Sequence, residues 1–450
     1  NILLIYMKKF LILLLFLLSL SFNSFGIIRD SEIESLIKEI VSPIAKAAKQ
    51  NEKNLKIFII NDDQVNAFVT PGQKMFIFSG LIINTKNTNE IEGVIAHELG
   101  HITGKHHIKI YETLEKSRVI SVVGLILGGA VQVLSGDPNA AAAIAGGALS
   151  TAERSILSFS RVQEGAADQA GFEFLKKSNK SICGIINFLE FLQNQQVGYQ
   201  KNAYTQSHPL TIERINDAKY AARNEDCSNN KKEKTNKKYG LTIEERYKFI
   251  QTKIIAFNNP ENALISLESN NNYNEDQKKY GLSIANYKSF NLIKANGLIN
   301  ELIEKYPLNP FFYELKAQML RENGFLKESL NGYLIVNKLL PNDPLVKIEL
   351  AHTLLNIDSK ENINKAIKIL LEAQKKESEN NKLWYLLSVA HGRNSEMAKS
   401  KYASAYSFYL KGDDAMALNF IKNAKKIVDK NSVTWVKLND LENKINSKKK

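Results

Sequence analysis

Two histidines four residues apart, His97 and His101, could bind one metal ion. They lie in the stretch GVIAHELGHITGKHH, residues 93–107. An α-helix turns about 100° per residue, so side chains four positions apart project from one face about one turn (~6 Å) from each other. Glu98 follows the first histidine, and in an H-E-x-x-H helix this glutamate lies beside the metal, where it can take a proton from bound water. The spacing therefore predicts two metal ligands and a general base.

Two further histidines of this stretch are predicted to lie outside the site. If the helix continues, His106 projects about 180° round from His97, and His107 lies about 15 Å further along the axis. Both neighbour lysines in the sequence. We therefore expect ordinary surface residues at both positions.

A third metal ligand must come from elsewhere in the chain, because a catalytic zinc usually has three protein ligands and one position open to water. Glu164 and Asp168 lie four apart in SRVQEGAADQAGFEFL, with the small residues 165–167 between them. Small residues let two helices approach closely. We predict that Glu164 is the third ligand and that Asp168, one turn on, accepts the outer N–H of a ligand histidine. A solvated helix face is the alternative.

Four motifs, in this order, resemble the zinc metallopeptidases of family 48, the gluzincins related to the CAAX prenyl protease, HtpX and the mitochondrial inner-membrane protease Oma. The motifs are NAFVTPGQKMFIFSGLI (66–82), HELGH (97–101), SRVQEGAAD (160–168) and SHPLTIERI (207–215). The resemblance covers roughly residues 30–220. It implies a zincin-like α+β fold and a zinc endopeptidase that binds one Zn²⁺ through the two motif histidines and Glu164, with Glu98 as catalytic base.

The same resemblance places His208, in SHPLTIERI, over the metal cleft, where two roles are open. As a neutral imidazole it could take the fourth zinc position, exclude the water and keep the enzyme latent, which is the role we favour. As a hydrogen-bond donor it could stabilise the developing oxyanion, together with Arg214. An ordinary loop histidine is the remaining alternative.

The N-terminus predicts export. A basic start at residues 7–9, the apolar run FLILLLFLL and small residues before position 27 indicate a signal peptide over residues 1–26. An uncleaved inner-membrane anchor is the alternative. Export suits a bacterial periplasm, where Cys183 and Cys227 could form a disulfide or remain two buried thiols.

Helical and strand patterns surround the motifs. Residues 31–50 carry apolar residues at helical spacing, and residues 55–61, 66–69 and 74–79 read as strands. An edge strand beside a metal cleft can pair with an extended substrate through main-chain hydrogen bonds. We predict residues 66–69 as this edge, with a plain core hairpin as the alternative.

The apolar segment 119–149 is interrupted by glycines and by Asp-Pro, so a conventional bilayer span is not expected. We predict a helical pair that covers the cleft or makes peripheral contact with a membrane surface. Fully buried core helices are the alternative.

The C-terminal half has a different character. Residues 223–239 are polar and lysine-rich, as is typical of a linker, and separate a peptidase domain at 27–222 from residues 240–450. Pro307 and Pro341 lie 34 residues apart, which is the tetratricopeptide period. We predict an all-α tetratricopeptide-like array of about four divergent repeats with a concave surface that binds peptide or protein.

Composition adds one exclusion. The chain has 450 residues and a net charge of +13, which could indicate a nucleic-acid partner. The excess is mostly lysine, and no nucleic-acid-binding motif occurs, so we predict no such partner.

Export signal, zinc peptidase and repeat array together resemble the periplasmic members of the family, which act on outer-membrane proteins. The resemblance implies a periplasmic endopeptidase that degrades misfolded or stalled outer-membrane proteins and assists their assembly. Unfolded or misassembled proteins would be its substrates, and the outer-membrane assembly machinery would bind the array. The alternatives are a chaperone or scaffold that acts mainly through the array, and a membrane-bound quality-control protease.

Overall fold

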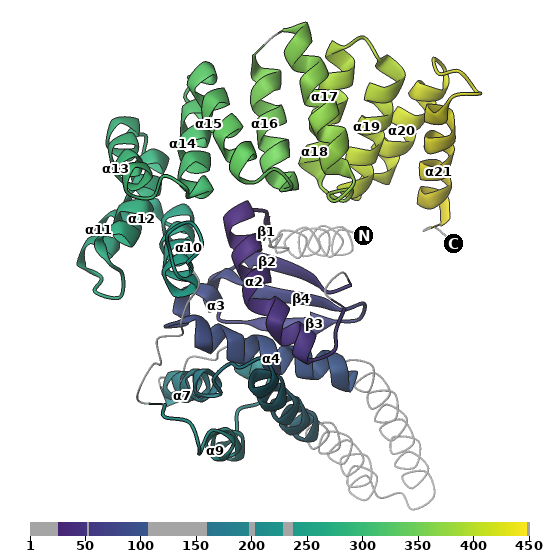
Figure 1. Cartoon of the computed structure of the whole chain (residues 1–450). Coiled ribbons are helices and arrows are strands. Elements are labelled where there is room, and N and C mark those ends of the chain that lie inside the picture. Colours follow the sequence, from purple (N-terminus) through teal and green to yellow (C-terminus); the bar gives the residue numbers. More distant parts are fainter. Residues whose placement is uncertain are drawn as a thin grey trace, which may run out of the picture. The chain divides into compact units, whose positions relative to one another are not determined.

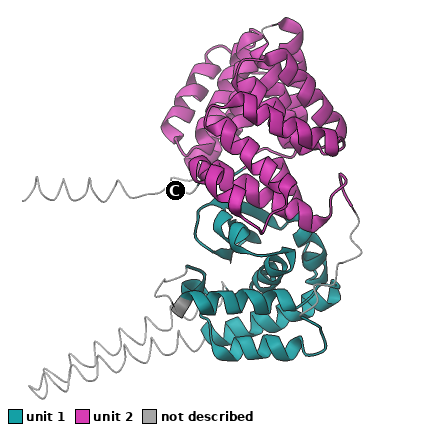
Figure 2. Ribbon diagram, turned by 90° about the vertical axis from the view of Figure 1, so that its left-hand side faces the viewer, with its two compact units in different colours: residues 1–28, 37–231 teal, residues 29–36, 232–450 magenta. Residues whose placement is uncertain are grey.

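The computed structural model describes residues 26–51, 54–106, 160–197, 203–227, 237–357 and 359–447. The chain divides into two compact units, coloured separately in Figure 2: unit 1 comprises residues 1–28 and 37–231, and unit 2 comprises residues 29–36 and 232–450. The predicted signal peptide up to residue 25, His107 and the segment 119–149 lie outside the described residues. None of the described helices is long and apolar enough to cross a bilayer.

Helix α2 (Ser31–Ala47) begins at a side-chain cap. The carboxylate of Asp30 accepts a hydrogen bond from the main-chain N–H of Ile33 (2.9 Å), one of the donors that a helix start leaves without an intrahelical partner. Apolar residues at helical spacing are at most 2% exposed: Ile33, Leu36, Ile37, Ile40 and Ile44. The predicted helix is confirmed, although it ends three residues earlier than expected.

The described residues of unit 1 contain a four-stranded sheet in the order β1-β2-β4-β3 (Figure 1). Its strands are β1 (Gly26–Ile28), β2 (Lys56–Asn61), β3 (Ala67–Thr70) and β4 (Lys74–Phe78). β2 and β4 pair in parallel, and the other pairs are antiparallel. Gly72 has a φ of +83° in the turn between β3 and β4, a conformation that glycine adopts without strain. The predicted strands are confirmed, and β3 lies at an edge of the sheet.

Helix α4 (Thr88–Gly104) carries the H-E-x-x-H motif and follows the short α3 (Ser79–Asn84). The side chain of Asn87 caps α4 by accepting from the N–H of Glu90 (3.1 Å). A second helical stretch, residues 160–177, crosses α4 closely. A Cβ at Gly100 would lie 2.4 Å from the main-chain oxygen of Ala167, so only glycine permits this approach. The small residues on both helices thus let the two motif segments meet.

Three further helices complete the described part of unit 1: α7 (Cys183–Val197), α8 (Ala203–Ser207) and α9 (Ile212–Ala221). A disulfide joins Cys183 at the start of α7 to Cys227, which follows α9, with a Cα–Cα distance of 5.4 Å. Close to the disulfide, the hydroxyl of Ser181 donates a hydrogen bond to the carboxylate of Glu225 (2.6 Å). Of the two alternatives for the cysteines, the structure contains the disulfide.

An isolated β-bridge joins Lys238 and Leu241 in unit 2. All the regular elements described after it are helices. These helices are α10 (Ile243–Asn258), α11 (Pro260–Ser269), α12 (Glu275–Lys288), α13 (Leu292–Lys305), α14 (Pro310–Glu322), α15 (Leu326–Leu339), α16 (Pro344–Asn356), α17 (Lys360–Gln374), α18 (Asn381–Arg393), α19 (Met397–Leu410), α20 (Asp414–Lys425) and α21 (Val433–Ser447). Each helix contacts the next along the chain, and α14 to α20 stand side by side (Figure 1). The predicted all-α array is confirmed.

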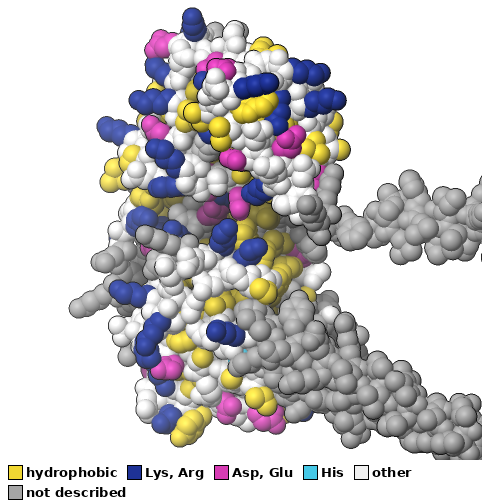
Figure 3. Space-filling view, turned by 90° about the vertical axis from the view of Figure 1, so that its right-hand side faces the viewer, with side chains coloured by type: hydrophobic (Ala, Val, Ile, Leu, Met, Phe, Trp, Pro, Cys, Tyr) yellow, Lys and Arg dark blue, Asp and Glu magenta, His cyan; other side chains and the backbone are white. Residues whose placement is uncertain are grey.

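The number of repeats was underestimated. Within residues 237–357 and 359–447, α10 to α21 make six successive helix pairs, whereas the sequence predicts about four repeats. The prediction relied on the period of Pro307 and Pro341, and no proline at this spacing precedes the first four helices, α10 to α13. On the face drawn in Figure 3, basic side chains of the upper part, unit 2, are interspersed with acidic and hydrophobic ones.

Candidate metal centre

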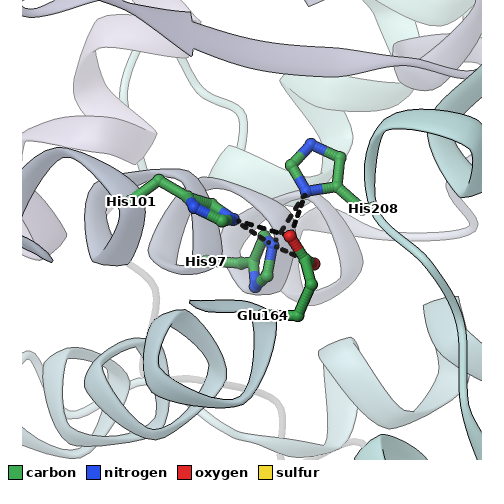
Figure 4. Close-up of side chains that lie close together, drawn as sticks. All are labelled: His97, His101, Glu164 and His208. Carbon is green, nitrogen blue, oxygen red and sulfur yellow. Dashed lines mark hydrogen bonds and ion pairs between the residues drawn. The ribbon is translucent and has the colours of Figure 1, made fainter. Parts of the chain in front are cut away.

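Four buried side chains from three segments of the chain meet in unit 1 (Figure 4). They are His97 and His101 on α4, Glu164 on the helix 160–177 and His208 just after α8. One possible ligand atom from each lies within 4.8 Å of the others, and none of the four residues is more than 8% exposed. The structure thus brings together the three predicted ligands and adds His208 as a fourth donor.

The donor atoms of the cluster fit a tetrahedral zinc site. The Nε2 atom of His97 lies 3.0 Å from Nε2 of His101 and 3.3 Å from Oε2 of Glu164. Oε1 of Glu164 lies 3.3 Å from Nε2 of His101. Tetrahedral zinc with bonds of about 2.0–2.1 Å separates its ligand atoms by about 3.3 Å. Imidazole nitrogens and a carboxylate are also the ligand types that zinc prefers.

Asp168 orients the first histidine. The Nδ1–H of His97 donates to Oδ1 of Asp168 at 2.7 Å, which leaves Nε2 of His97 with its lone pair directed into the cluster. Burial by itself would lower the pKa of His97, but the charges of Asp168 and Glu164 and the hydrogen bonds to them together raise this pKa to about 10 in the absence of a metal ion. The contact is the one that the sequence predicts for Asp168.

Arg214, on α9, holds both carboxylates in place. Its Nε and Nη2 donate to Asp168 at 2.6 and 2.9 Å, and its Nη1 lies 2.9 Å from Oε2 of Glu164. Burial opposes ionisation of Glu164, but its hydrogen bonds with the surrounding histidines lower its pKa well below the usual range. To act as the oxyanion donor considered above, Arg214 would have to leave these partners. Its geometry instead indicates a role in positioning the ligands.

His106 contradicts the prediction of a surface residue. It is only 5% exposed, and its Nδ1 lies 3.0 Å from Nδ1 of His101. The prediction extended the helix too far: Lys105 adopts a left-handed conformation with φ 53°, so α4 ends before His106 and the direction of this side chain does not follow from a continuous helix. His106 can therefore accept the outer N–H of His101, as Asp168 does for His97.

Glu98 is a buried carboxylate that receives no hydrogen bond from the part of the chain that the structure describes. It is 0% exposed, and among the described residues neither of its oxygens accepts a hydrogen bond. Oε1 of Glu98 lies 3.4 Å from Nε2 of His208. Burial raises the pKa of Glu98, partly opposed by the charges of the neighbouring histidines. A carboxylate in this environment is suited to accepting and releasing a proton.

His208 turns its Nδ1 into the cluster. This atom lies 3.2 Å from Nε2 of His97 and 3.3 Å from Oε1 of Glu164. The ring of Tyr204 stacks on the His208 imidazole, with centroids 4.6 Å apart and an interplanar angle of 27°. Sequence reasoning did not identify Tyr204, although it lies four positions before His208 at the spacing of one helical turn. A surface loop histidine does not fit this geometry, because His208 is only 6% exposed.

Sequence comparisons identify related proteins. Residues 29–222 match the sequence model of Peptidase family M48. The "Beta-barrel assembly-enhancing protease" of Escherichia coli K12 is 22% identical over 415 residues, which are 90% of this chain and 81% of that protein. The protein of the same name from Yersinia pestis is 25% identical over 300 residues, which are 65% of this chain. The match covers 59% of the Yersinia pestis protein, which is less than two thirds of its length. "Metalloprotease YcaL" of Escherichia coli K12 is 30% identical over 182 residues, 39% of this chain and 65% of that protein.

Among solved structures, yeast Tom70 has a TM-score of 0.37 and 13% identity, and the match covers 91% of this chain and 77% of that one. This similarity is too low to argue from, and the repeat architecture rests on the helix pairs described above. The family match implies a metal ion, and the cluster of His97, His101, Glu164 and His208 is the group of described residues that could hold it. Residues 29–222, the segment that carries all four side chains of the cluster, are similar to peptidase family M48.

Proposed function

We propose that the chain is a zinc endopeptidase of the bacterial periplasm that degrades misfolded or stalled outer-membrane proteins. The observation that carries the proposal is the convergence of His97, His101 and Glu164 beside a buried carboxylate, Glu98, that lacks a hydrogen-bond donor among the described residues. Two imidazoles and one carboxylate are the ligand set of a catalytic rather than a structural zinc site, because three protein ligands leave a fourth position for water when His208 does not take it.

In the proposed mechanism the chain's own residues move one proton. A zinc ion held by the three ligands would activate a water molecule and polarise the scissile carbonyl. Glu98 accepts the proton of the attacking water and later donates it to the leaving amine. Asp168 and Arg214 hold His97 and Glu164 in position throughout.

The edge strand β3 offers a way to hold an extended substrate. β3 contacts α4, the helix that carries Glu98 and two of the ligands (Figure 1). An unfolded segment that adds to this edge is bound through main-chain hydrogen bonds, which are available to any sequence. This mode suits a protease whose substrates share an unfolded state rather than a recognition motif.

Compartment and client proteins are inferred from two further observations. A disulfide such as Cys183–Cys227 forms and persists in oxidising compartments, which include the periplasm. Two of the relatives are named for enhancing β-barrel assembly. We infer that the helices of unit 2 bind partner proteins of outer-membrane assembly, because stacked helix pairs typically form extended binding surfaces.

The test uses the purified full chain loaded with zinc. Glu98→Gln should keep one zinc per chain and lower the cleavage of an unfolded test protein by about 10²- to 10⁴-fold, because only the proton acceptor is removed. Glu164→Ala should lose both zinc and cleavage. Elemental analysis measures the metal, and gel electrophoresis with mass spectrometry measures cleavage.

Glu190→Gln serves as the matched control, since Glu190 is an exposed carboxylate of the same unit paired with Lys219. It should behave as the wild type in both measurements. Full zinc content in Glu164→Ala would reject the ligand assignment. If Glu98→Gln still corrects an outer-membrane defect in cells, the scaffold alternative is favoured over proteolysis.

A further inference from the structure

Three phenylalanines form a row across the sheet. Phe58 on β2, Phe76 on β4 and Phe68 on β3 are paired directly in register. Their ring centroids are 5.1 and 4.9 Å apart, with interplanar angles of 17° and 18°, so the rings are stacked. All three are only partly buried, whereas the alternate residues Met75 and Ile77 are fully buried on the opposite face. The row therefore lies on the partly exposed face of the sheet.

The row ends at the open edge of β3. The N–H of Phe78 donates to the carbonyl of Asn66 at 3.0 Å, which makes these two residues a hydrogen-bonded pair of the antiparallel ladder. Hydrogen-bonded pairs alternate along such a ladder, so Ala67 and Val69 direct their N–H and C=O groups away from β4. Among the described residues no strand lies beyond β3. An added strand can therefore pair with Ala67 and Val69.

We propose that the position beyond Phe68 is a subsite for an aromatic side chain of the substrate. The proposal rests on the endopeptidase function and specifies which extended segments that enzyme prefers. A substrate strand paired with Ala67 and Val69 places one of its residues opposite Phe68. Side chains of residues paired in register point to the same face of a sheet, so this residue becomes the fourth member of the row.

The ring of Phe68 then has a stacking partner on the substrate. An aromatic pair strengthens binding about 2- to 12-fold beyond the effect of buried area. Phe76 and Phe58 support Phe68 from behind, because their rings stack on it in sequence. The position next along the strand on this face, Thr70, pairs with Lys74 and offers no ring. One aromatic residue per bound segment, at a fixed distance from the cleaved bond, is therefore expected.

This preference agrees with the proposed client class. Strands of outer-membrane barrels carry aromatic residues in girdles at both membrane interfaces, within segments of about ten residues that alternate in polarity. An unfolded barrel strand thus presents an aromatic ring on one face when it is extended. Such a segment matches an edge with a single aromatic position.

The experiment uses the zinc-loaded full chain and a set of extended peptides. Each peptide carries one phenylalanine at a different one of the varied positions and alanine at the others. The wild type should cleave with a kcat/KM about 2- to 12-fold higher when phenylalanine stands at one fixed position relative to the scissile bond. Phe68→Ala should bring this ratio to about one. Phe68→Leu keeps an apolar side chain in the strand but removes the ring, and should also lower the ratio. It serves as the test if the alanine variant does not fold.

Peptide binding gives a readout without catalysis. The Glu98→Gln chain should bind the preferred phenylalanine peptide more tightly than the alanine peptide, by the same ratio, in fluorescence anisotropy. Tyr220→Ala is the control, because Tyr220 is an aromatic residue of unit 1, 68% exposed, outside the row. This variant should keep the wild-type ratio.

The possible failures are distinguishable. Cleavage without any positional preference for phenylalanine, or a preference that survives both Phe68 variants, rejects the subsite and leaves the endopeptidase function standing. Absence of cleavage of every peptide by the zinc-loaded chain, and by the same chain with His208→Ala, rejects the endopeptidase function and the subsite with it.

Discussion

The Nδ1 atom of His208 lies 3.2 Å from the Nε2 atom of His97, at the point where the metal-binding side chains meet. A histidine at this point can take the position that a catalytic zinc otherwise leaves open for water. The stacked ring of Tyr204 and the main-chain hydrogen bond from His208 N–H to the Tyr204 carbonyl (2.7 Å) hold it there. We propose that His208 in this position keeps the site latent.

His208→Ala is therefore expected to raise the cleavage of an unfolded protein above the wild-type rate, because water regains access to the cluster. Zinc content should stay at the wild-type level, since three ligands remain. The rate is measured with a fluorescent unfolded substrate, and His391→Ala, which changes a buried histidine of unit 2, is the control. A fall in rate of about 10²-fold or more would instead assign His208 to oxyanion stabilisation.

A second prediction concerns His106 as the partner of His101. Without an acceptor for its outer N–H, the His101 imidazole is less well oriented, so His106→Ala should weaken zinc binding about 10- to 100-fold. His106→Asn supplies an amide oxygen in place of the ring and should recover part of the loss. Competition with a chromogenic chelator measures the affinity.

Gly104→Ala tests the same contact independently. A Cβ at residue 104 would lie 2.2 Å from Nε2 of His106, so the ring must move away. Zinc affinity should fall as it does in His106→Ala, whereas His352→Ala, at a partly exposed histidine of unit 2, should leave it unchanged. Wild-type affinity in both the His106 and Gly104 variants would show that this histidine does not position His101.

The sequence predicts those parts of the site that depend on regular helix geometry. His97 with His101, and Glu164 with Asp168, are each four residues apart on one helix, so their common direction follows from the spacing alone. His106 was predicted wrongly because its position depends on the left-handed Lys105, and a lysine gives no signal of a helix end at that point.

Other features depend on packing that no local pattern records. Arg214 faces Asp168 and Glu164 because α9 lies against the helix 160–177, and from sequence it could equally have faced a substrate. The array shows the same limit. The period came from Pro307 and Pro341, which lie just before α14 and α16, whereas no proline at this spacing marks the first four helices, α10 to α13.

The disulfide should contribute substantially to the stability of unit 1. Cys183 and Cys227 are 44 residues apart, and closing a loop of this size in the unfolded chain corresponds to about 4 kcal/mol in the chain-entropy model. Reduction, or the double variant Cys183→Ser/Cys227→Ser, should lower the denaturant concentration at which half of unit 1 is unfolded. Circular dichroism measures this unfolding. Adding a reductant to the double variant should have no further effect. Equal midpoints for the oxidised and reduced wild type would contradict the prediction.

The last prediction concerns the pH dependence of unit 2. Nη1 of Arg321 lies 2.8 Å from Oε2 of Glu349, and Lys382 also contacts this carboxylate. Burial alone would raise the pKa of Glu349, but His352, Lys382 and Arg321 lower it from the ordinary value of 4.5 to about 2. Because the folded state holds the proton less tightly than the unfolded state, the ionised carboxylate stabilises unit 2 above about pH 5, and this contribution is lost as the pH falls towards 2.

At about 1.4 kcal/mol per pKa unit, the lowered pKa of Glu349 corresponds to ~3 kcal/mol in the free energy of unfolding at neutral pH. Glu349→Gln should therefore lower the free energy of unfolding at pH 7, and its difference from the wild type should shrink to near zero by about pH 2. Both tryptophans of the chain, Trp384 and Trp435, lie in unit 2, so their fluorescence during urea unfolding reports on this unit alone. Glu301→Gln, at an exposed carboxylate paired with Lys279, is the control and should change little at any pH. If the wild type and Glu349→Gln lose stability in parallel down to pH 2, the ionised Glu349 does not stabilise the fold.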